Sequence, residues 1–154
     1  MTCKIHLVTD GKGRPLGLVL TGGNAADTTF LQTVVETIEV HGGGPGRSRT
    51  RPERVLADKA YTAKANRDYL TRRGIKVTIP ERDDQKAGRA RRGSAGGRPR
   101  TFDSQAYKGR NVVERCFNRL KNWRGIATRY DKTARSYLGG VTLAAALIWI
   151  KSAV

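Results

Sequence analysis

The sequence predicts an α/β protein in which a mixed sheet is flanked by helices. Short apolar strands alternate along the chain with amphipathic helical segments, and glycine- and proline-rich turns separate them. The length of 154 residues is ordinary for one domain with a buried core. The apolar fraction of 38% is low but sufficient for folding.

The chain opens with a predicted hairpin. Residues 4–8 (KIHLV) and 15–20 (PLGLVL) are its strands, and an Asp-Gly turn joins them. Asp10 is therefore interpreted as a turn residue rather than a catalytic one. Because the first strand starts close to the initiating methionine, the sheet is expected to be incomplete at its N-terminal side.

A helix is predicted over residues 28–40, with Asp27 as its N-cap. Its apolar residues recur at helical spacing, and they are Phe30, Leu31, Val34, Val35 and Ile38. Residues 41–52 (HGGGPGRSRTRP) form a loop that is rich in glycine, proline and arginine.

The next unit is predicted to be strand, helix, strand. Residues 54–57 (RVLA) form a short apolar strand that ends directly on Asp58. A helix follows over 62–74, closed by Gly74 as its C-cap, and residues 75–80 form a strand that its proline terminates.

Residues 81–106 are predicted to be a flexible basic insertion within the domain. Residues 81–100 contain seven Arg and Lys, four Gly and no aliphatic side chain larger than Ala. Such a segment cannot bury itself, so we expect it to be mobile unless a partner orders it.

A helix is predicted over residues 107–121 (YKGRNVVERCFNRLK). At about 100° per residue, four polar side chains fall within an arc of roughly 60°. They are Tyr107, Arg110, Glu114 and Lys121. The opposite side of this helix is apolar and is formed by Val112, Val113, Cys116, Phe117 and Leu120.

The chain ends in an apolar stretch over residues 137–150. Its longest apolar run, 141–150, is well short of the ~20 residues that span a bilayer. We interpret it as a buried helix, and no membrane association is expected.

The charge points to a polyanionic partner. The chain has 30 Lys and Arg against 13 Asp and Glu, for a net charge of +17. Nucleic acid is the first candidate, and a generally solvated basic surface is the alternative. Arg89, Arg91 and Arg92 are candidate DNA contacts, because each arginine near a phosphate releases counterions. A solvated tether is the alternative interpretation of their segment.

Cysteine and histidine spacing argues against two other kinds of site. Cys3 and Cys116 lie far apart without a CxxC pattern, and His6 and His41 form no ligand pair. Disulfide frameworks and zinc sites are thus disfavoured, and a reduced, cytoplasmic compartment fits. A structural RNA-binding protein is disfavoured too, since no pair of strand aromatics could stack bases.

Two carboxylates are candidates for metal chemistry. Asp58 follows a buried strand, where the active sites of open α/β sheets collect, although a helix N-cap is the alternative. Glu114 could equally form a surface salt bridge contributing only ~0–1 kcal/mol. Carboxylates at a strand end and a neighbouring helix suit Mg²⁺, and two such ions can promote phosphodiester attack. A convincing third carboxylate is not evident.

These residues resemble a known family. The stretch 107–121 has the form Y-x2-R-x3-E-x6-K, which is similar to the signature of the DDE transposases of bacterial insertion sequences. VLADKAY (55–61) resembles the segment with that family's second catalytic aspartate. Residues 2–27 resemble the strand pair that follows the first aspartate. The likeness covers nearly the whole chain and is closest to the insertion-sequence-five type.

The resemblance implies a ribonuclease-H-like fold. It implies that Asp58 and Glu114 are the second and third catalytic carboxylates and bind Mg²⁺ or Mn²⁺. Tyr107, Arg110 and Lys121 would contact the DNA at the element ends. The implied reaction is metal-assisted strand cleavage, followed by attack of the freed 3′-hydroxyl on target DNA. A homodimer and association with the bacterial nucleoid are further expectations.

One departure from the family pattern limits these expectations. The strand with the first aspartate and the N-terminal helical region that binds element ends have no counterpart here, and Asp10 is not a substitute. Residues 1–154 are therefore expected to be a partial catalytic domain, inactive until joined to an upstream frame product. A decayed remnant and a non-catalytic DNA-binding protein or transposition repressor are the alternatives.

Overall fold

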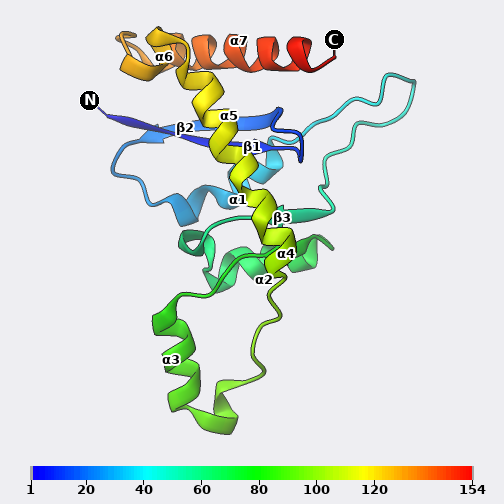
Figure 1. Cartoon of the computed structure of the whole chain (residues 1–154), viewed down its shortest axis with the longest axis vertical. Coiled ribbons are helices and arrows are strands. Elements are labelled where there is room, and N and C mark those ends of the chain that lie inside the picture. Colours follow the sequence, from blue (N-terminus) through cyan, green and yellow to red (C-terminus); the bar gives the residue numbers. More distant parts are fainter. Residues whose placement is uncertain (1, 154) are drawn as a thin grey trace. The chain divides into compact units, whose positions relative to one another are not determined.

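The computed structural model describes residues 2–153 and shows two compact units (Figure 1). Unit 1 is formed by three stretches, Met1–Ala26, Gln32–Thr50 and Asn111–Val154. Unit 2 is formed by Asp27–Leu31 and Arg51–Arg110. Both contain strands and helices, so the predicted α/β class is observed.

The hairpin of unit 1 forms as predicted. Strands β1 (Cys3–Thr9) and β2 (Pro15–Gly22) are antiparallel. In the turn, Asp10 Oδ1 accepts hydrogen bonds from the backbone N–H groups of Lys12 and Arg14, each at 2.9 Å. Partial burial raises the pKa of the Asp10 carboxyl, but the hydrogen bonds outweigh burial and hold that pKa below its ordinary value. The interpretation of Asp10 as a turn residue is confirmed.

Three C-terminal helices pack on one face of the hairpin. They are α5 (Asn111–Lys121), α6 (Arg124–Thr128) and α7 (Ala134–Ala153). Their core side chains are Cys116, Leu120, Ile126, Tyr137, Val141, Ala144 and Ile148, and Cys3, Ile5, Leu7, Leu18 and Leu20 of the hairpin pack against them. The predicted apolar side of the 107–121 segment is thus confirmed for Cys116 and Leu120, which are buried.

The other face of the hairpin meets the end of α1 (Leu31–Glu36). Gly17 of β2 allows this approach, because a Cβ there would lie 2.0 Å from Thr37 Oγ1. The predicted helix over 28–40 is shorter than expected, since its first turn is a 3₁₀ helix, η1 (Asp27–Phe30).

Helix α7 is longer than the predicted segment and only one of its faces is buried. Val141 is fully buried, whereas Leu143 and Ile150 are 64% and 60% exposed. The interpretation of this stretch as a buried helix is therefore wrong for one side, because a single packed layer covers only part of a helix's circumference. Across residues 2–153, no helix combines the length and hydropathy that a membrane span requires.

Unit 2 contains a second sheet. Strands β3 (Arg54–Leu56) and β4 (Lys76–Thr78) are parallel, and α2 (Lys64–Arg72) connects them. Gly74 ends α2 as predicted, with a φ of 68° that favours glycine. Instead of the single mixed sheet expected from the element order, residues 2–153 thus contain two two-stranded sheets.

The basic segment contains a helix where the sequence predicts a loop. Helix α3 (Asp83–Arg91) is followed by a 3₁₀ turn, η3 (Gly93–Gly96). The helix has no buried residue, so apolar periodicity could not reveal it. Acidic side chains in its first turn and basic ones in its last turn complement the helix dipole.

The helix predicted from Tyr107 to Lys121 is not continuous. Tyr107 ends α4 (Ser104–Tyr107), a 3₁₀ turn η4 (Lys108–Arg110) follows, and α5 begins at Asn111. Gly109 explains the turn, because it has low helix propensity and its backbone packs against Leu56. A 3₁₀ turn advances about 120° per residue, so the predicted common arc holds within α5 only.

Candidate functional site

Asp58 lies just beyond the carboxyl end of β3, in the loop that leads to the 3₁₀ helix η2 (Lys59–Tyr61). Its Oδ1 accepts a hydrogen bond of 2.8 Å from the backbone N–H of Ala60, so Asp58 is the N-cap of η2. The position is the one that the sequence predicts, and the side chain is partly exposed. The cap uses one carboxylate oxygen.

A second carboxylate lies close to Asp58 in unit 2. The pKa of the Tyr61 hydroxyl is raised to about 12, chiefly by burial and further by the negative charges of Asp27 and Asp58. η1, which begins at Asp27, packs against η2. The two carboxylates therefore share one neighbourhood around Tyr61.

Two residues of the Y-R-E-K pattern are positioned beside β3 in unit 2. A Cβ on Gly109 would lie 3.3 Å from Leu56 Cδ1, which places η4 against the last residue of β3. Asp103 strengthens this placement: its Oδ2 accepts a 2.9 Å hydrogen bond from Arg54 and its Oδ1 caps α4. The turn with Tyr107 and Arg110 is thus fixed to the strand that leads to Asp58.

Tyr107 and Arg110 also contact each other. The Arg110 guanidinium lies over the Tyr107 ring, 5.9 Å from its centroid. The Phe102 ring packs against the Tyr107 ring, with 5.2 Å between the two centroids. Tyr107 and Arg110 are both half-buried, and the ring holds the guanidinium against the protein.

The other two residues of the pattern, Glu114 and Lys121, lie on α5 in unit 1. They are seven residues apart, which places them about 20° apart around a regular helix. Both side chains are exposed, while Cys116 and Leu120 between them face the core. The four residues of the pattern are therefore divided between the two units.

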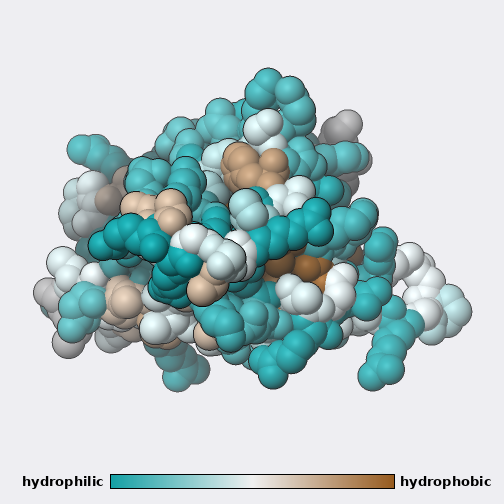
Figure 2. All heavy atoms as spheres, turned by 90° about the horizontal axis from the view of Figure 1, so that it is seen from below, coloured by the Kyte–Doolittle hydropathy of each residue, from teal (hydrophilic) through white to brown (hydrophobic). Residues whose placement is uncertain are grey.

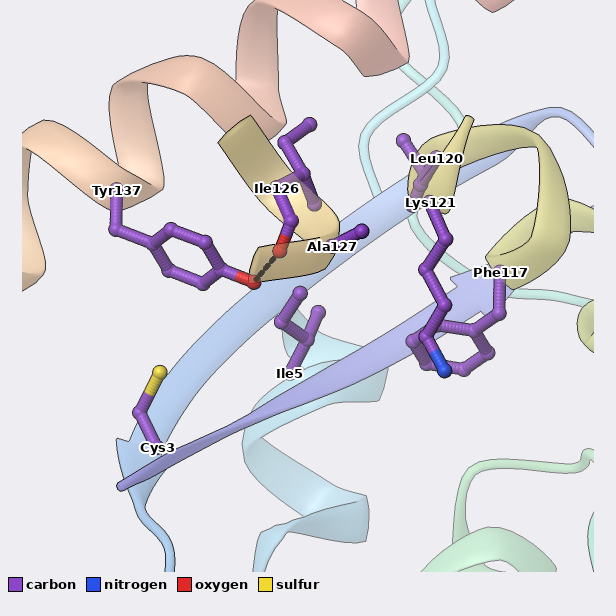
Figure 3. Close-up of a pocket in the computed structure, with 8 residues that line it drawn as sticks. All are labelled: Cys3, Ile5, Phe117, Leu120, Lys121, Ile126, Ala127 and Tyr137. Carbon is purple, nitrogen blue, oxygen red and sulfur yellow. Dashed lines mark hydrogen bonds between the residues drawn. The ribbon is translucent and has the colours of Figure 1, made fainter. Parts of the chain in front are cut away.

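Lys121 borders an open cavity of about 360 Å³ in unit 1 (Figure 3). Inside it, the Tyr137 hydroxyl donates a 3.0 Å hydrogen bond to the Ile126 carbonyl, and burial raises the pKa of Tyr137. The other lining residues are Cys3, Ile5, Phe117, Leu120 and Ala127. The wall is largely apolar, and Lys121 supplies the cation at its rim.

The three predicted DNA-binding arginines of the basic segment differ in their surroundings. Arg89 is paired with Glu81 and is only 20% exposed. Arg91 and Arg92 are exposed and make no ion pair within residues 2–153. Glu81, a residue that the sequence analysis did not single out, therefore decides which arginines remain available.

A family model described as "Transposase DDE domain" matches residues 1–149. The chain belongs to this family. It is 32% identical over 151 residues to "Putative transposase for insertion sequence element IS6501" of Brucella ovis, a match that covers 98% of this chain and 100% of the relative. The recognition of a DDE transposase of insertion sequences is confirmed.

A second relative of this DDE domain is longer. "Putative transposase for insertion sequence element IS402" of Burkholderia cepacia is 34% identical over 131 residues, which are 85% of this chain and 54% of that protein. The chain thus spans about half the length of that relative. No solved structure shows a significant match.

The spacing of the sequence predicts only a local capping role for Asp27 and does not indicate that Asp27 neighbours Asp58. A helix and a loop separate Asp27 from Asp58 along the chain, so their spacing does not predict that they lie close together. Among residues 2–153 of the DDE domain, no group of three or more His, Cys, Asp or Glu side chains converges on one point.

Proposed function

We propose that this chain carries catalytic residues of a DDE transposase, which cleaves DNA at the ends of an insertion sequence and joins the ends to target DNA. The observation that best supports this is the packing of the η4 turn against Leu56, two residues before Asp58. It brings Tyr107 and Arg110 to the strand end that precedes a carboxylate, within one compact unit.

The chemistry of two carboxylates, each considered in its own unit, suits a hard divalent cation. Asp58 uses Oδ1 for its cap, and its Oδ2 makes no hydrogen bond within residues 2–153, so one carboxylate oxygen is available. Glu114 adds an exposed carboxylate from α5. Oxygen ligands of this kind are those that Mg²⁺ and Mn²⁺ prefer. Because the chain belongs to the DDE transposase family, we propose that Asp58 and Glu114 each serve as a ligand of a divalent ion.

Each side chain has a distinct proposed role. The bound ion supplies Lewis-acid activation of the attacking oxygen and stabilisation of the leaving oxygen. Arg110, held over the Tyr107 ring, and Lys121, at the end of α5, bind phosphates of the element-end DNA. The backbone N–H of Ala60 donates to Asp58 Oδ1. We propose that this hydrogen bond orients the carboxylate for metal binding.

Metal binding by the chain itself tests this assignment. We expect Mn²⁺, followed by the electron paramagnetic resonance of the free ion, to bind the wild-type chain at a site that Asp58→Asn weakens by about tenfold or more. Glu114→Gln should also weaken Mn²⁺ binding. In a polypeptide in which this domain cleaves element-end DNA, Glu114→Gln should abolish cleavage and leave DNA binding intact.

Asp68→Asn is the matched control, because Asp68 is a surface carboxylate on α2 that pairs with Lys64. It should leave Mn²⁺ affinity unchanged. Equal Mn²⁺ binding by wild type, Asp58→Asn and Glu114→Gln would contradict the proposed ligand set.

A non-catalytic DNA-binding protein or transposition repressor is the second candidate, and the net charge of +17 favours it. It predicts DNA affinity that falls steeply with salt and does not depend on a divalent ion. DNA binding that requires Mg²⁺ or Mn²⁺ would exclude this candidate.

A further inference from the structure

The basic arm, which we define as residues 82–100, is tied together at its base by one carboxylate. Glu81 Oε2 accepts a hydrogen bond of 2.9 Å from Arg89, and its Oε1 pairs with the same guanidinium. Arg100 Nε lies 3.5 Å from Glu81 Oε1. Because Arg89 lies in the last turn of α3 and Arg100 lies in the irregular segment that follows the η3 turn, Glu81 connects both sides of the arm.

Glu81 also compensates a cluster of like charges. Burial lowers the pKa of Arg67, the nearby positive charge of Arg100 lowers it further, and Glu81 opposes that effect. Arg67 itself donates to the Ile79 carbonyl at 2.7 Å, immediately before the arm begins. Three guanidinium groups therefore converge on one carboxylate that is only 11% exposed.

The tip of the arm is folded back onto Arg89. A Cβ on Gly96 would lie 2.3 Å from the Arg89 carbonyl oxygen, so the η3 turn reaches the helix end only because residue 96 is glycine. The backbone N–H of Arg92 donates to that same carbonyl at 3.1 Å. The Arg89 side chain thus pairs with Glu81 at the base of the arm, and the Arg89 carbonyl lies against Gly96 at its tip.

The remaining cations of the arm fall into two groups. Arg82 pairs with Asp84 at 3.0 Å and Lys86 pairs with Asp83 at 3.1 Å, so the N-terminal end of α3 is locally neutralised. Three exposed arginines make no ion pair within residues 2–153, and they are Arg91, Arg92 and Arg98. All three flank the η3 turn, and the face of the molecule seen from the side of α3 is largely hydrophilic (Figure 2).

We propose that Arg91, Arg92 and Arg98 form a preorganised contact for the phosphate backbone of duplex DNA, and that Glu81 is the positioning residue that holds them in place. This inference rests on the proposed transposase function. Arg98 replaces Arg89 among the DNA contacts expected from the sequence, because the Arg89 guanidinium is paired with Glu81. Fixing the arm in advance lowers the entropy lost when its arginines bind.

The first test compares two triple variants that remove equal charge. We expect Arg91→Ser/Arg92→Ser/Arg98→Ser to reduce the salt slope of binding to a labelled mixed-sequence DNA duplex by about two to three, since each phosphate contact contributes about 0.9. The control, Arg47→Ser/Lys132→Ser/Arg135→Ser, removes three exposed cations outside unit 2. It should reduce the slope by less than about one.

The second test separates position from charge. Glu81→Gln removes one negative charge and raises the net charge by one, so simple electrostatics predicts tighter DNA binding. A positioning role predicts the opposite, with about tenfold weaker binding and faster trypsin cleavage within the arm. Tighter binding with unchanged trypsin resistance would overturn the role of Glu81.

Two glycine-to-alanine variants, which leave the charge of the arm unchanged, test the proposal even if Glu81→Gln does not fold. Gly96→Ala places a methyl group against the Arg89 carbonyl and should weaken DNA binding and expose the arm to trypsin. Gly88→Ala, on the same arm, meets no atom within 4 Å and should change neither. Equal behaviour of the two alanine variants would overturn the folded-tip contact.

The outcomes distinguish this inference from the proposed function. If the wild-type chain does not bind duplex DNA, the proposed function fails. If it binds with a steep salt slope that the arm variants leave unchanged, DNA contact lies elsewhere and only this inference fails.

Discussion

Apolar side chains fill the interior of unit 1, whereas the interior of unit 2 combines apolar side chains such as Leu70 and Ile75 with buried polar contacts. In unit 1, Leu120 and Val141 are almost fully buried among other apolar side chains. In unit 2, the Arg67 guanidinium donates to Thr62 and to the Ile79 carbonyl. Asn66, also buried, donates to the Thr28 carbonyl at 2.8 Å.

This difference has a functional consequence. An apolar core tolerates a change of side chain if the volume is kept, whereas a buried hydrogen-bond network requires particular donors and acceptors. The network of unit 2 fixes the segment from Ile79 to Glu81 at which the basic arm begins. In unit 2, buried polar residues thus hold the segment that leads to the charged arm. In unit 1, the apolar core holds α5.

The largest effect is expected in the core of unit 1. Leu120→Ala should lower the free energy of unfolding by about 2–5 kcal/mol, because it removes buried methyl groups and leaves a cavity. Urea denaturation followed by circular dichroism measures this. Leu143→Ala, at an exposed position of α7, should cost less than about 1 kcal/mol. Similar costs for the two substitutions would contradict the packing of α5 and α7 on the hairpin.

An intermediate effect is expected in unit 2. Arg67→Met keeps the apolar stem but removes the donors to Thr62 and Ile79, which leaves buried acceptors without partners. We expect a loss of about 1–3 kcal/mol in the free energy of unfolding. Arg72→Met, at an exposed position of the same helix, is the control and should be nearly neutral. A neutral Arg67→Met would show that the hydrogen bonds of Arg67 do not stabilise unit 2.

The smallest effect is a pH dependence. The hydrogen bond from Arg89 is the main cause that holds the pKa of Glu81 below its ordinary value of 4.5, against the opposing effect of burial. A depressed folded-state pKa contributes stability that is present above 4.5 and is lost as the pH falls through the folded-state pKa.

The unfolding free energies of wild type and Glu81→Gln should therefore differ by a constant amount above pH 4.5 and converge below it. Comparing the two chains at each pH removes the titration of other acids, including Asp10, from the difference. A difference that stays constant to the lowest pH would show that the Glu81 ion pairs do not stabilise the fold.

Much of the local structure could be predicted from the sequence. The hairpin, the turn at Asp10 and the cap at Gly74 depend on local backbone preferences, and the structure confirms them. The buried side of α5 follows from helical periodicity. Helix α3 could not be predicted from that signal, because no residue of it is buried.

The candidate site was only partly predictable for a related reason. Asp58 was found because a strand end is a local feature, and the Y-R-E-K pattern was found from its spacing. The 3₁₀ turn at Gly109 depends on contact with Leu56, which is distant in the chain. The engagement of Arg89 by Glu81 depends on how the arm folds back, and the neighbourhood of Asp27 and Asp58 depends on the packing of η1 on η2.

The sequence by itself determined the family, the excess of positive charge and the positions of the carboxylates, because residue type and spacing along the chain specify all three. Only the tertiary structure decided which cations are engaged and which face solvent. Arg89 and Arg91 are equivalent in charge and nearly adjacent in sequence, yet Glu81 pairs with Arg89 and leaves Arg91 exposed. The physical reason is that an ion pair depends on distance in space, which the fold of the arm sets.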